Sequence, residues 1–188
     1  MPVLIIVLSY LIGAIPTAYI IGHAVAGRDI RKMGDENMGA ANAYRELGRR
    51  AGIVVGLVDT VKGVLVIIIA QAAGMPQVTV MLAGTAAVVG HNWPAFIGFR
   101  GGRGVSTTIG ILLVLVTWPM LILALPTLTI LVLKRNVTPA MAFFFIALPL
   151  VDWWLRVPVP LIIYGVALPA LVGATTFFRT RPKAVRQA

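Results

Sequence analysis

The chain has 188 residues, of which 59% are hydrophobic, and its mean hydropathy is +0.95. A soluble domain is usually nearer half apolar, so this composition excludes an ordinary water-soluble fold. The formal net charge of +10 points, in a membrane protein, to anionic lipid headgroups and phosphorylated substrates rather than nucleic acid. The absence of cysteine excludes disulfides, thiolate metal ligands and a cysteine nucleophile.

Seven apolar segments are expected to be membrane-spanning helices, because backbone groups in lipid must be hydrogen-bonded within their own segment. The first segment lacks a basic leader and a clear cleavage site, so it is interpreted as a retained span rather than a signal peptide. The sequence predicts an all-α integral membrane protein, with one domain over residues 1–188. The segments cover about residues 2–22, 51–73, 77–97, 105–118, 119–133, 138–155 and 158–178.

The basic residues indicate the orientation of these spans. All but two of the 16 lie in the first loop, the third and fifth connections, and the C-terminal tail. By the positive-inside rule, that side faces the cytoplasm, the N-terminus lies outside and the C-terminus is cytoplasmic. The residues assigned to this side are Arg28, Arg31, Lys32, Arg45, Arg49, Arg50, Arg100, Arg103, Lys134, Arg135, Arg179, Arg181, Lys183 and Arg186.

The segment of residues 105–133 is long for one membrane span and short for two spans. Pro119 and Pro126 favour two short helices, which also keep Lys134 and Arg135 on the basic side. A single tilted helix is the alternative, and it would move both basic residues to the opposite side.

The first loop is rich in asparagine, glycine and charge between residues 34 and 45. If the chain is helical from Ala40, then Asn42 and Arg45 share one face. Asparagine amides can donate to and accept from a polyol phosphate, so Asn37, Asn42 and Arg45 are candidate ligands. The alternative is a solvated loop whose basic residues only set the topology.

Two polar features interrupt the apolar segments. Asp59 and Lys62 lie one helical turn apart within the second segment. We favour a structural pair near the cytoplasmic end of the span, with the lysine snorkelling. The alternative is that the pair braces a polar site. His91 is more simply a hydrogen-bonded structural residue than a base or a phosphate donor. The two histidines are far apart and no carboxylates cluster with them, so a metal site is not expected.

Residues 98–108 combine glycines and arginines directly before an expected helix. Glycines let backbone N–H groups approach an anion, arginines supply forked donors, and Ser106 could cap the helix. The segment lacks the Lys-Ser/Thr ending of a Walker loop and follows no strand, so we predict a different phosphate site. A flexible basic turn is the alternative. The residues expected to cradle phosphate are Gly101, Gly102, Arg103 and Gly104.

These motifs together resemble a known family. Residues 90–96 and 99–105 are similar to the second signature of the bacterial PlsY-type acyl-phosphate:glycerol-3-phosphate acyltransferases, approximately Gly-His-x-x-Pro-x-Phe and Phe-x-Gly-Gly-Lys-Gly-Val. Residues 34–45 resemble the family's Gly-Ser-Gly-Asn-x-Gly-Ala-Thr-Asn-x-x-Arg, and residues 59–63 match its Asp-x-x-Lys-Gly. Order, spacing and chain length agree over nearly the whole sequence.

The resemblance implies transfer of a fatty acyl group from acyl phosphate to glycerol 3-phosphate, giving lysophosphatidate for phospholipid biosynthesis. It also implies a bacterial plasma-membrane enzyme with a cytoplasmic site, no cofactor, and an upstream enzyme that forms the acyl phosphate. By this resemblance Arg45 and Arg103 are the catalytic candidates, and Asn37 and Asn42 share their pocket. The residues expected to support the site are Asp59, Lys62, His91 and Ser106.

The chain departs from the family pattern in its first signature, at Arg103 in its second, and in its third, approximately Arg-His-Arg-x-Asn, which corresponds to residues 179–183. Asp35 and Glu36 replace a serine and a glycine, so two acids stand where an anion is expected. A divergent, impaired homologue that binds a phosphorylated metabolite or lipid is therefore a second hypothesis. A small organic-phosphate transporter ranks last, because the charges gather on one side. The other departures are at Ala41, Arg103, Thr180 and Lys183.

Overall fold

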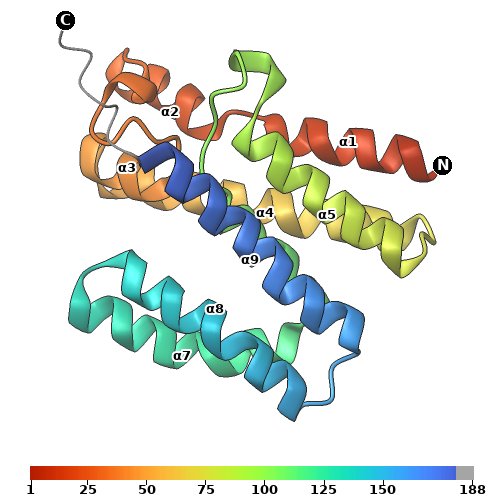
Figure 1. Cartoon of the computed structure of the whole chain (residues 1–188). Helices are drawn as coiled ribbons and strands as arrows, with labels where there is room; N and C mark the ends of the chain where they lie inside the picture. Colours follow the sequence, from red (N-terminus) through yellow and green to blue (C-terminus); the bar gives the residue numbers. More distant parts are fainter. Residues whose placement is uncertain (181–188) are drawn as a thin grey trace, which may run out of the picture.

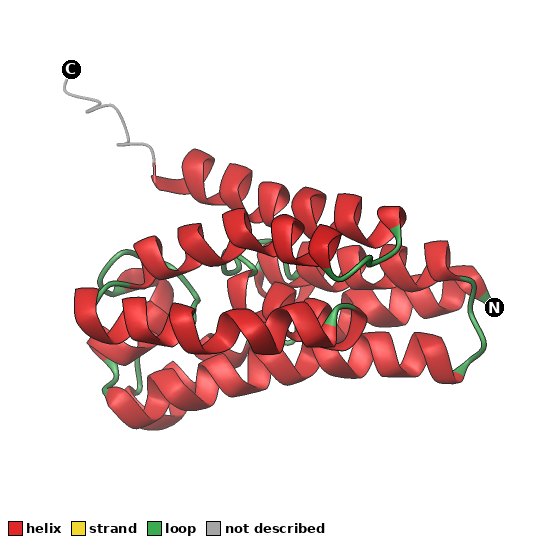
Figure 2. Ribbon diagram, turned by 90° about the horizontal axis from the view of Figure 1, so that it is seen from below, coloured by secondary structure: helices red, strands yellow, loops and turns green. Residues whose placement is uncertain are grey.

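A computed structural model describes residues 1–180, apart from the side chain of Thr180; the tail positions Arg181, Lys183 and Arg186 lie outside the described residues. Every regular element in the described part is helical, which confirms the all-α fold (Figures 1 and 2). The α-helices are α1 (Pro2–Ala14), α2 (Thr17–Ala26), α3 (Ala40–Glu46), α4 (Arg49–Ala72), α5 (Gln77–Asn92), α6 (Val105–Leu115), α7 (Thr117–Lys134), α8 (Val137–Trp154) and α9 (Val159–Thr180), with short 3-10 turns η1 (Ile30–Lys32) and η2 (Ala95–Ile97).

Six stretches of the described chain are long and apolar enough to cross a membrane. Large apolar side chains such as Leu125 and Ile146 are 73% and 70% exposed, as lipid-facing residues would be. The remaining apolar helix, α6, has only 11 residues. At about 1.5 Å per residue it covers about half of a bilayer core of about 30 Å, so it differs from the full spans.

Residues 105–133 form two helices, as expected, although the boundary differs slightly. The break is at Val116, whose φ and ψ of −134° and 55° end α6 and precede α7. Pro119 lies in the first turn of α7, where a missing N–H costs no intrahelical bond. Pro126 lies inside α7 without ending it, so only Pro119 acts near the break.

The first apolar segment was expected as one helix over residues 2–22, but it forms two. Helix α1 ends at Ala14, and α2 starts at Thr17. Pro16 causes the break, because its ring disfavours helical backbone at Ile15, whose ψ is 117°. The carbonyl of Ile15 is thereby released from the helical pattern and is available to another side chain.

Glycines allow two pairs of helices to pack backbone against backbone. In the α1–α5 pair, Gly90 lies against the carbonyl of Tyr10. In the α4–α6 pair, Gly63 lies against the carbonyl of Thr107, and Gly110 against that of Thr60. A side chain at any of these glycines would collide with backbone, so small residues are required for these crossings.

The helices run broadly along one direction, and α9 crosses over the bundle while α7 and α8 form a hairpin at one side (Figures 1 and 2). The first loop, α3, the α7–α8 connection and the end of α9 lie at one end of the bundle, and Met1 lies at the other. The basic loops that the sequence assigned to one side of the membrane therefore share one end of the molecule. This is the end at which the predicted site residues gather.

Candidate functional site

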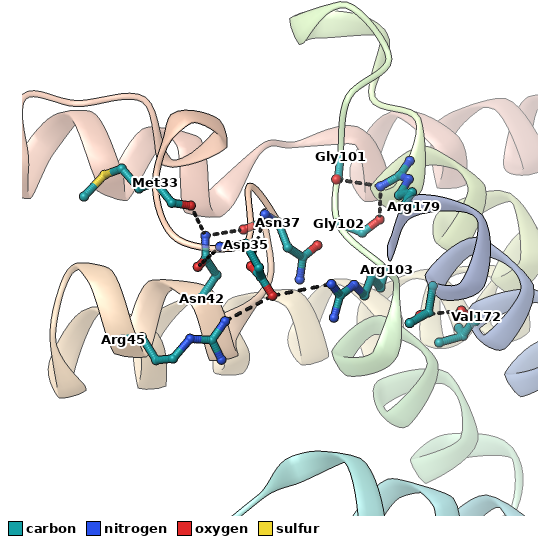
Figure 3. Close-up of polar contacts among 11 residues, drawn as sticks. Met33, Asp35, Asn37, Asn42, Arg45, Gly101, Gly102, Arg103, Val172 and Arg179 are labelled. Carbon is teal, nitrogen blue, oxygen red and sulfur yellow. Dashed lines mark hydrogen bonds and ion pairs between the residues drawn. The ribbon is translucent and has the colours of Figure 1, made fainter. Parts of the chain in front are cut away.

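Two loops meet at this end of the bundle, the segment before α3 and the segment before α6 (Figure 3). They bring together Arg45 of α3 and Arg103, which precedes α6. Both guanidinium groups approach one carboxylate oxygen: Asp35 Oδ2 lies 3.0 Å from Arg45 Nη2 and 3.4 Å from Arg103 Nη2. The two arginines thus form a site where a single anionic oxygen is held by both, and Asp35 holds that position.

The site is open to solvent, and one N–H donor of Arg103 is not used by the described part of the protein. The side chains of Arg45, Asp35 and Arg103 are 52%, 36% and 25% exposed, respectively. Arg103 Nε is buried and has no hydrogen-bond partner among the described residues. Guanidinium groups bind phosphate through paired N–H donors, so this unused donor suits a second contact to an anion.

The two predicted asparagines have different surroundings. Asn42 is fully buried; its amide donates to the carbonyls of Met33 and Asn37, at 3.0 and 2.9 Å, and accepts from the N–H of Asp35 at 3.2 Å. Its hydrogen bonds therefore shape the loop that carries Asp35. The side chain of Asn37 points toward Arg103 (Figure 3) and lies beside the Asp35–Arg103 contact.

The glycine loop differs from the expected cradle of free N–H groups. The N–H of Gly101 donates to the carbonyl of Asn92, and the N–H of Gly102 to that of His91, both at 3.1 Å. These two donors are already used within the protein, so they are not available to a phosphate. Gly101 and Gly102 are instead needed for close packing, since a side chain on Gly102 would collide with the His91 ring.

The donors that remain lie one step further along the chain. Gly104 has a left-handed φ of +85° and precedes α6, which turns the backbone into the helix. The first N–H groups of a helix have no intrahelical acceptor and carry a partial positive charge. The start of α6, with the half-buried Ser106, follows Arg103 directly in the chain, so its N–H groups are the candidate donors that the glycines do not supply.

Arg179, near the end of α9, holds the glycine loop in place. Its Nη1 donates to the carbonyls of Gly101 and Gly102 at 2.7 and 2.6 Å, and its Nη2 donates to the carbonyl of Asn92. Its guanidinium carbon lies 5.6 Å from the centre of the Trp93 ring, within cation–π range. The sequence analysis placed Arg179 among the tail charges and at the first position of the altered third signature. It did not predict this contact, because nothing local to α9 signals a loop so distant in the sequence.

Asp59 and Lys62 are buried and close the break between α1 and α2. Lys62 Nζ donates to Asp59 Oδ1 at 2.8 Å and also to the Ile15 carbonyl and the Thr17 hydroxyl, and that hydroxyl donates to Asp59 at 2.9 Å. With 5% of its side chain exposed, Lys62 does not snorkel, so the favoured interpretation was wrong on this point. Thr17 was missed, although a hydroxyl directly after a proline in an apolar span was a usable signal.

This buried cluster reaches the glycine loop through His91. The His91 Nδ1 lies 3.8 Å from Asp59 Oδ1, while its ring packs under Gly102. A cavity of about 10 Å³ lies between these groups, bounded also by Pro94. It has room for at most one water, so it is no substrate pocket, and the cluster acts as a support beneath the open arginine site.

Arg31 connects the same two loops at a second point. It forms a bidentate pair with Asp29, and its Nη1 donates to the carbonyl of Ile97 in η2 at 2.8 Å. The hydrogen-bonded Arg31 guanidinium holds the pKa of the Asp29 carboxyl below its usual value. The pairing favours both charged forms, which keeps this connection intact at neutral pH.

Comparison with known proteins agrees with this architecture. A family model described as glycerol-3-phosphate acyltransferase matches residues 3–187. Glycerol-3-phosphate acyltransferase 4 of Dehalococcoides mccartyi is 48% identical over 181 residues, which cover 96% of this chain and 98% of that relative. Glycerol-3-phosphate acyltransferase 2 of Moorella thermoacetica is 53% identical over 110 residues, 58% of this chain and 56% of that relative.

The similarity to solved structures indicates the same family. The chain is similar to PlsY, an integral membrane glycerol 3-phosphate acyltransferase, in its glycerol 3-phosphate form, with a TM-score of 0.85, 30% identity, and coverage of 94% of this chain and 88% of that chain. The lysophosphatidic acid form of PlsY gives a TM-score of 0.81 at 29% identity, over 96% of this chain and 88% of that chain. The chain therefore belongs to the glycerol-3-phosphate acyltransferase family.

Proposed function

We propose that this integral membrane protein transfers a fatty acyl group from acyl phosphate to the 1-hydroxyl of glycerol 3-phosphate, yielding lysophosphatidate and inorganic phosphate. The observation that carries the proposal is the convergence of Arg45 and Arg103, from distant parts of the chain, on one anionic oxygen. Such a pair suits a phosphate monoester. Family membership and relatives named glycerol-3-phosphate acyltransferase support acyl transfer to glycerol 3-phosphate.

The reaction needs alignment and charge stabilisation more than a nucleophile from the protein. The substrate hydroxyl oxygen attacks the acyl carbon, the bond from that carbon to the phosphate oxygen breaks, and phosphate leaves. The hydroxyl proton passes to a substrate phosphate oxygen, so no protein base is required. Two anionic reactants repel each other, and clustered cations and N–H donors reduce that barrier.

We assign the residue roles from their positions. Arg45 and Arg103 hold the phosphate of glycerol 3-phosphate, with the Asn37 amide beside them. Gly104 and Ser106 present the N–H groups at the start of α6 to the phosphate of the acyl donor. The remaining predicted residues shape or support the site: Asn42 orders the first loop, Gly101 and Gly102 allow close packing, and Asp59, Lys62 and His91 brace the structure beneath it.

We further propose that this end of the bundle faces the cytoplasm of a bacterial cell, with the N-terminus outside. The clustering of basic loops at one end supports this orientation. The acyl chain would lie among the apolar helices, while the polar substrate enters from water. The donor would be supplied by an upstream enzyme that forms acyl phosphates, and residues 1–188 would act as one domain.

The impaired-homologue hypothesis has one specific observation in its favour, because Asp35 occupies the position between the arginines. An assay separates the two hypotheses: purified protein with palmitoyl phosphate and glycerol 3-phosphate, followed for lysophosphatidate and phosphate release. We expect both products in equal amounts. Substrate binding without either product, beside an active relative as the positive control, would favour the impaired homologue.

A further inference from the structure

The carboxylate of Asp35 occupies the centre of the arginine site. It accepts from Arg45 and Arg103 through one oxygen, Oδ2, while its other oxygen accepts from the Asn37 N–H at 3.3 Å. Figure 3 shows the carboxylate lying between the two guanidinium groups, which come from different elements. An oxygen of a bound phosphate would need the same donors, so carboxylate and phosphate cannot both occupy this position.

We propose that Asp35 is a displaceable internal competitor that sets the affinity of this site for phosphate. The inference rests on the proposed function for the identity of the substrate, but not for the binding behaviour itself. Asp35 neutralises part of the charge of Arg45 and Arg103 through these two ion pairs. A phosphate binds only by taking over the N–H donors that Asp35 uses. Its net binding free energy is therefore reduced by the free energy needed to displace the Asp35 carboxylate.

The local structure allows the carboxylate to leave without unfolding the loop. The backbone N–H of Asp35 is held by the buried Asn42 amide, which fixes the main chain. The side chain is 36% exposed, so rotation about χ1 moves the carboxylate into water. The 3.4 Å contact with Arg103 is long for a charged hydrogen bond, so that half of the interaction is weak.

Internal competition makes a quantitative prediction that other roles for Asp35 do not. Removing a competitor raises the affinity of every ligand that binds the arginine pair by the same factor, whatever the rest of that ligand. If Asp35 instead contacted the glycerol hydroxyls, its loss would weaken glycerol 3-phosphate and leave inorganic phosphate unchanged. If Asp35 only stabilised the loop, its loss would weaken both ligands.

The experiment measures dissociation constants by isothermal titration of the full chain in detergent, with inorganic phosphate and with glycerol 3-phosphate. Asp35→Asn is expected to tighten both ligands by about three- to tenfold, the factor that one or two exposed ion pairs are worth. Asp35→Ser serves as the second variant if Asp35→Asn does not fold. Glu46→Gln removes the same charge from the last residue of α3. In the described part of the chain Arg45 and Arg103 pair with Asp35 and not with Glu46, so this variant should change affinity by less than about twofold.

The effect must also depend on the arginines. In an Arg45→Ala background, Asp35→Asn should produce a smaller gain for both ligands, because one of the contested donors is gone. Unchanged or weakened binding of inorganic phosphate by Asp35→Asn would overturn the proposal, as would an equal gain with Glu46→Gln. None of these measurements requires turnover, so failure of the acylation assay would not decide them.

Discussion

Arg179 Nη1 lies 2.6 Å from the carbonyl oxygen of Gly102, joining the end of the last helix to the loop before α6. The same guanidinium reaches the carbonyls of Gly101 and Asn92. One side chain thereby holds three backbone oxygens, one at the end of α5 and two in the loop before α6. The position of Arg103, and of the start of α6, depends on this contact.

Replacing Arg179 should therefore disturb substrate binding without any contact to substrate. Arg179→Met should raise the KM for glycerol 3-phosphate by about tenfold, because hydrogen bonds from a charged donor contribute about 1.5–3 kcal/mol. Hydrogen exchange of residues 98–104 should rise in the same variant. Lys134→Met removes an equivalent charge from the same end of the bundle and serves as the control; equal effects from both variants would rule out a specific contact.

The buried pair beneath the site should respond asymmetrically to substitution. Lys62→Met leaves the Asp59 carboxylate buried without its charged partner, and should lower the free energy of unfolding by about 3–5 kcal/mol. The double variant Asp59→Asn with Lys62→Met removes both charges, so it should recover part of that loss. Denaturant titration of the two variants tests this, and a double variant less stable than Lys62→Met would contradict it.

Gly102 should be required for packing rather than as a phosphate donor. In Gly102→Ala the new methyl group meets the His91 ring, so we expect a lower Tm as well as weaker phosphate binding. Gly173→Ala, a helical position with no neighbour within 4 Å, should be neutral or stabilising by up to about 1 kcal/mol. Weaker binding by Gly102→Ala at an unchanged Tm would instead indicate that phosphate approaches this backbone directly and is blocked by the added methyl group.

The proposed orientation can be tested directly, because the chain has no cysteine of its own. Lys134→Cys and Arg156→Cys place single thiols at opposite ends of the bundle. With a membrane-impermeant maleimide on intact cells, we expect labelling of Arg156→Cys at once and of Lys134→Cys only after permeabilisation. External labelling at Lys134 would reverse the orientation.

Much of the architecture could be predicted from local patterns. Beyond the first segment, hydropathy located the apolar helices to within a few residues, and the prolines indicated two helices over residues 105–133, because both signals are set by nearby residues. The break at Pro16 was missed, although the ring of that proline causes it. Its consequence could not be read from the first segment alone, since the freed carbonyl of Ile15 is used by Lys62 on another helix.

The site was only partly predictable for the same reason. Arg45 and Arg103 were identified by their residue types and motif positions, and the structure brings them together. Asp35 was recognised as an unfavourable charge, but its position between the two arginines depends on how the loops meet. The use of the Gly101 and Gly102 N–H groups within the protein depends likewise on packing against the end of α5.

The central claim is that the pair formed by Arg45 and Arg103 holds the phosphate of glycerol 3-phosphate. Its most direct test is the dissociation constant for glycerol 3-phosphate of Arg103→Ala, compared with Arg100→Ala in the same loop. We predict at least about tenfold weaker binding for Arg103→Ala, equivalent to about 1.4 kcal/mol, and little change for Arg100→Ala. Equal dissociation constants for Arg103→Ala and the unmodified protein would contradict the claim.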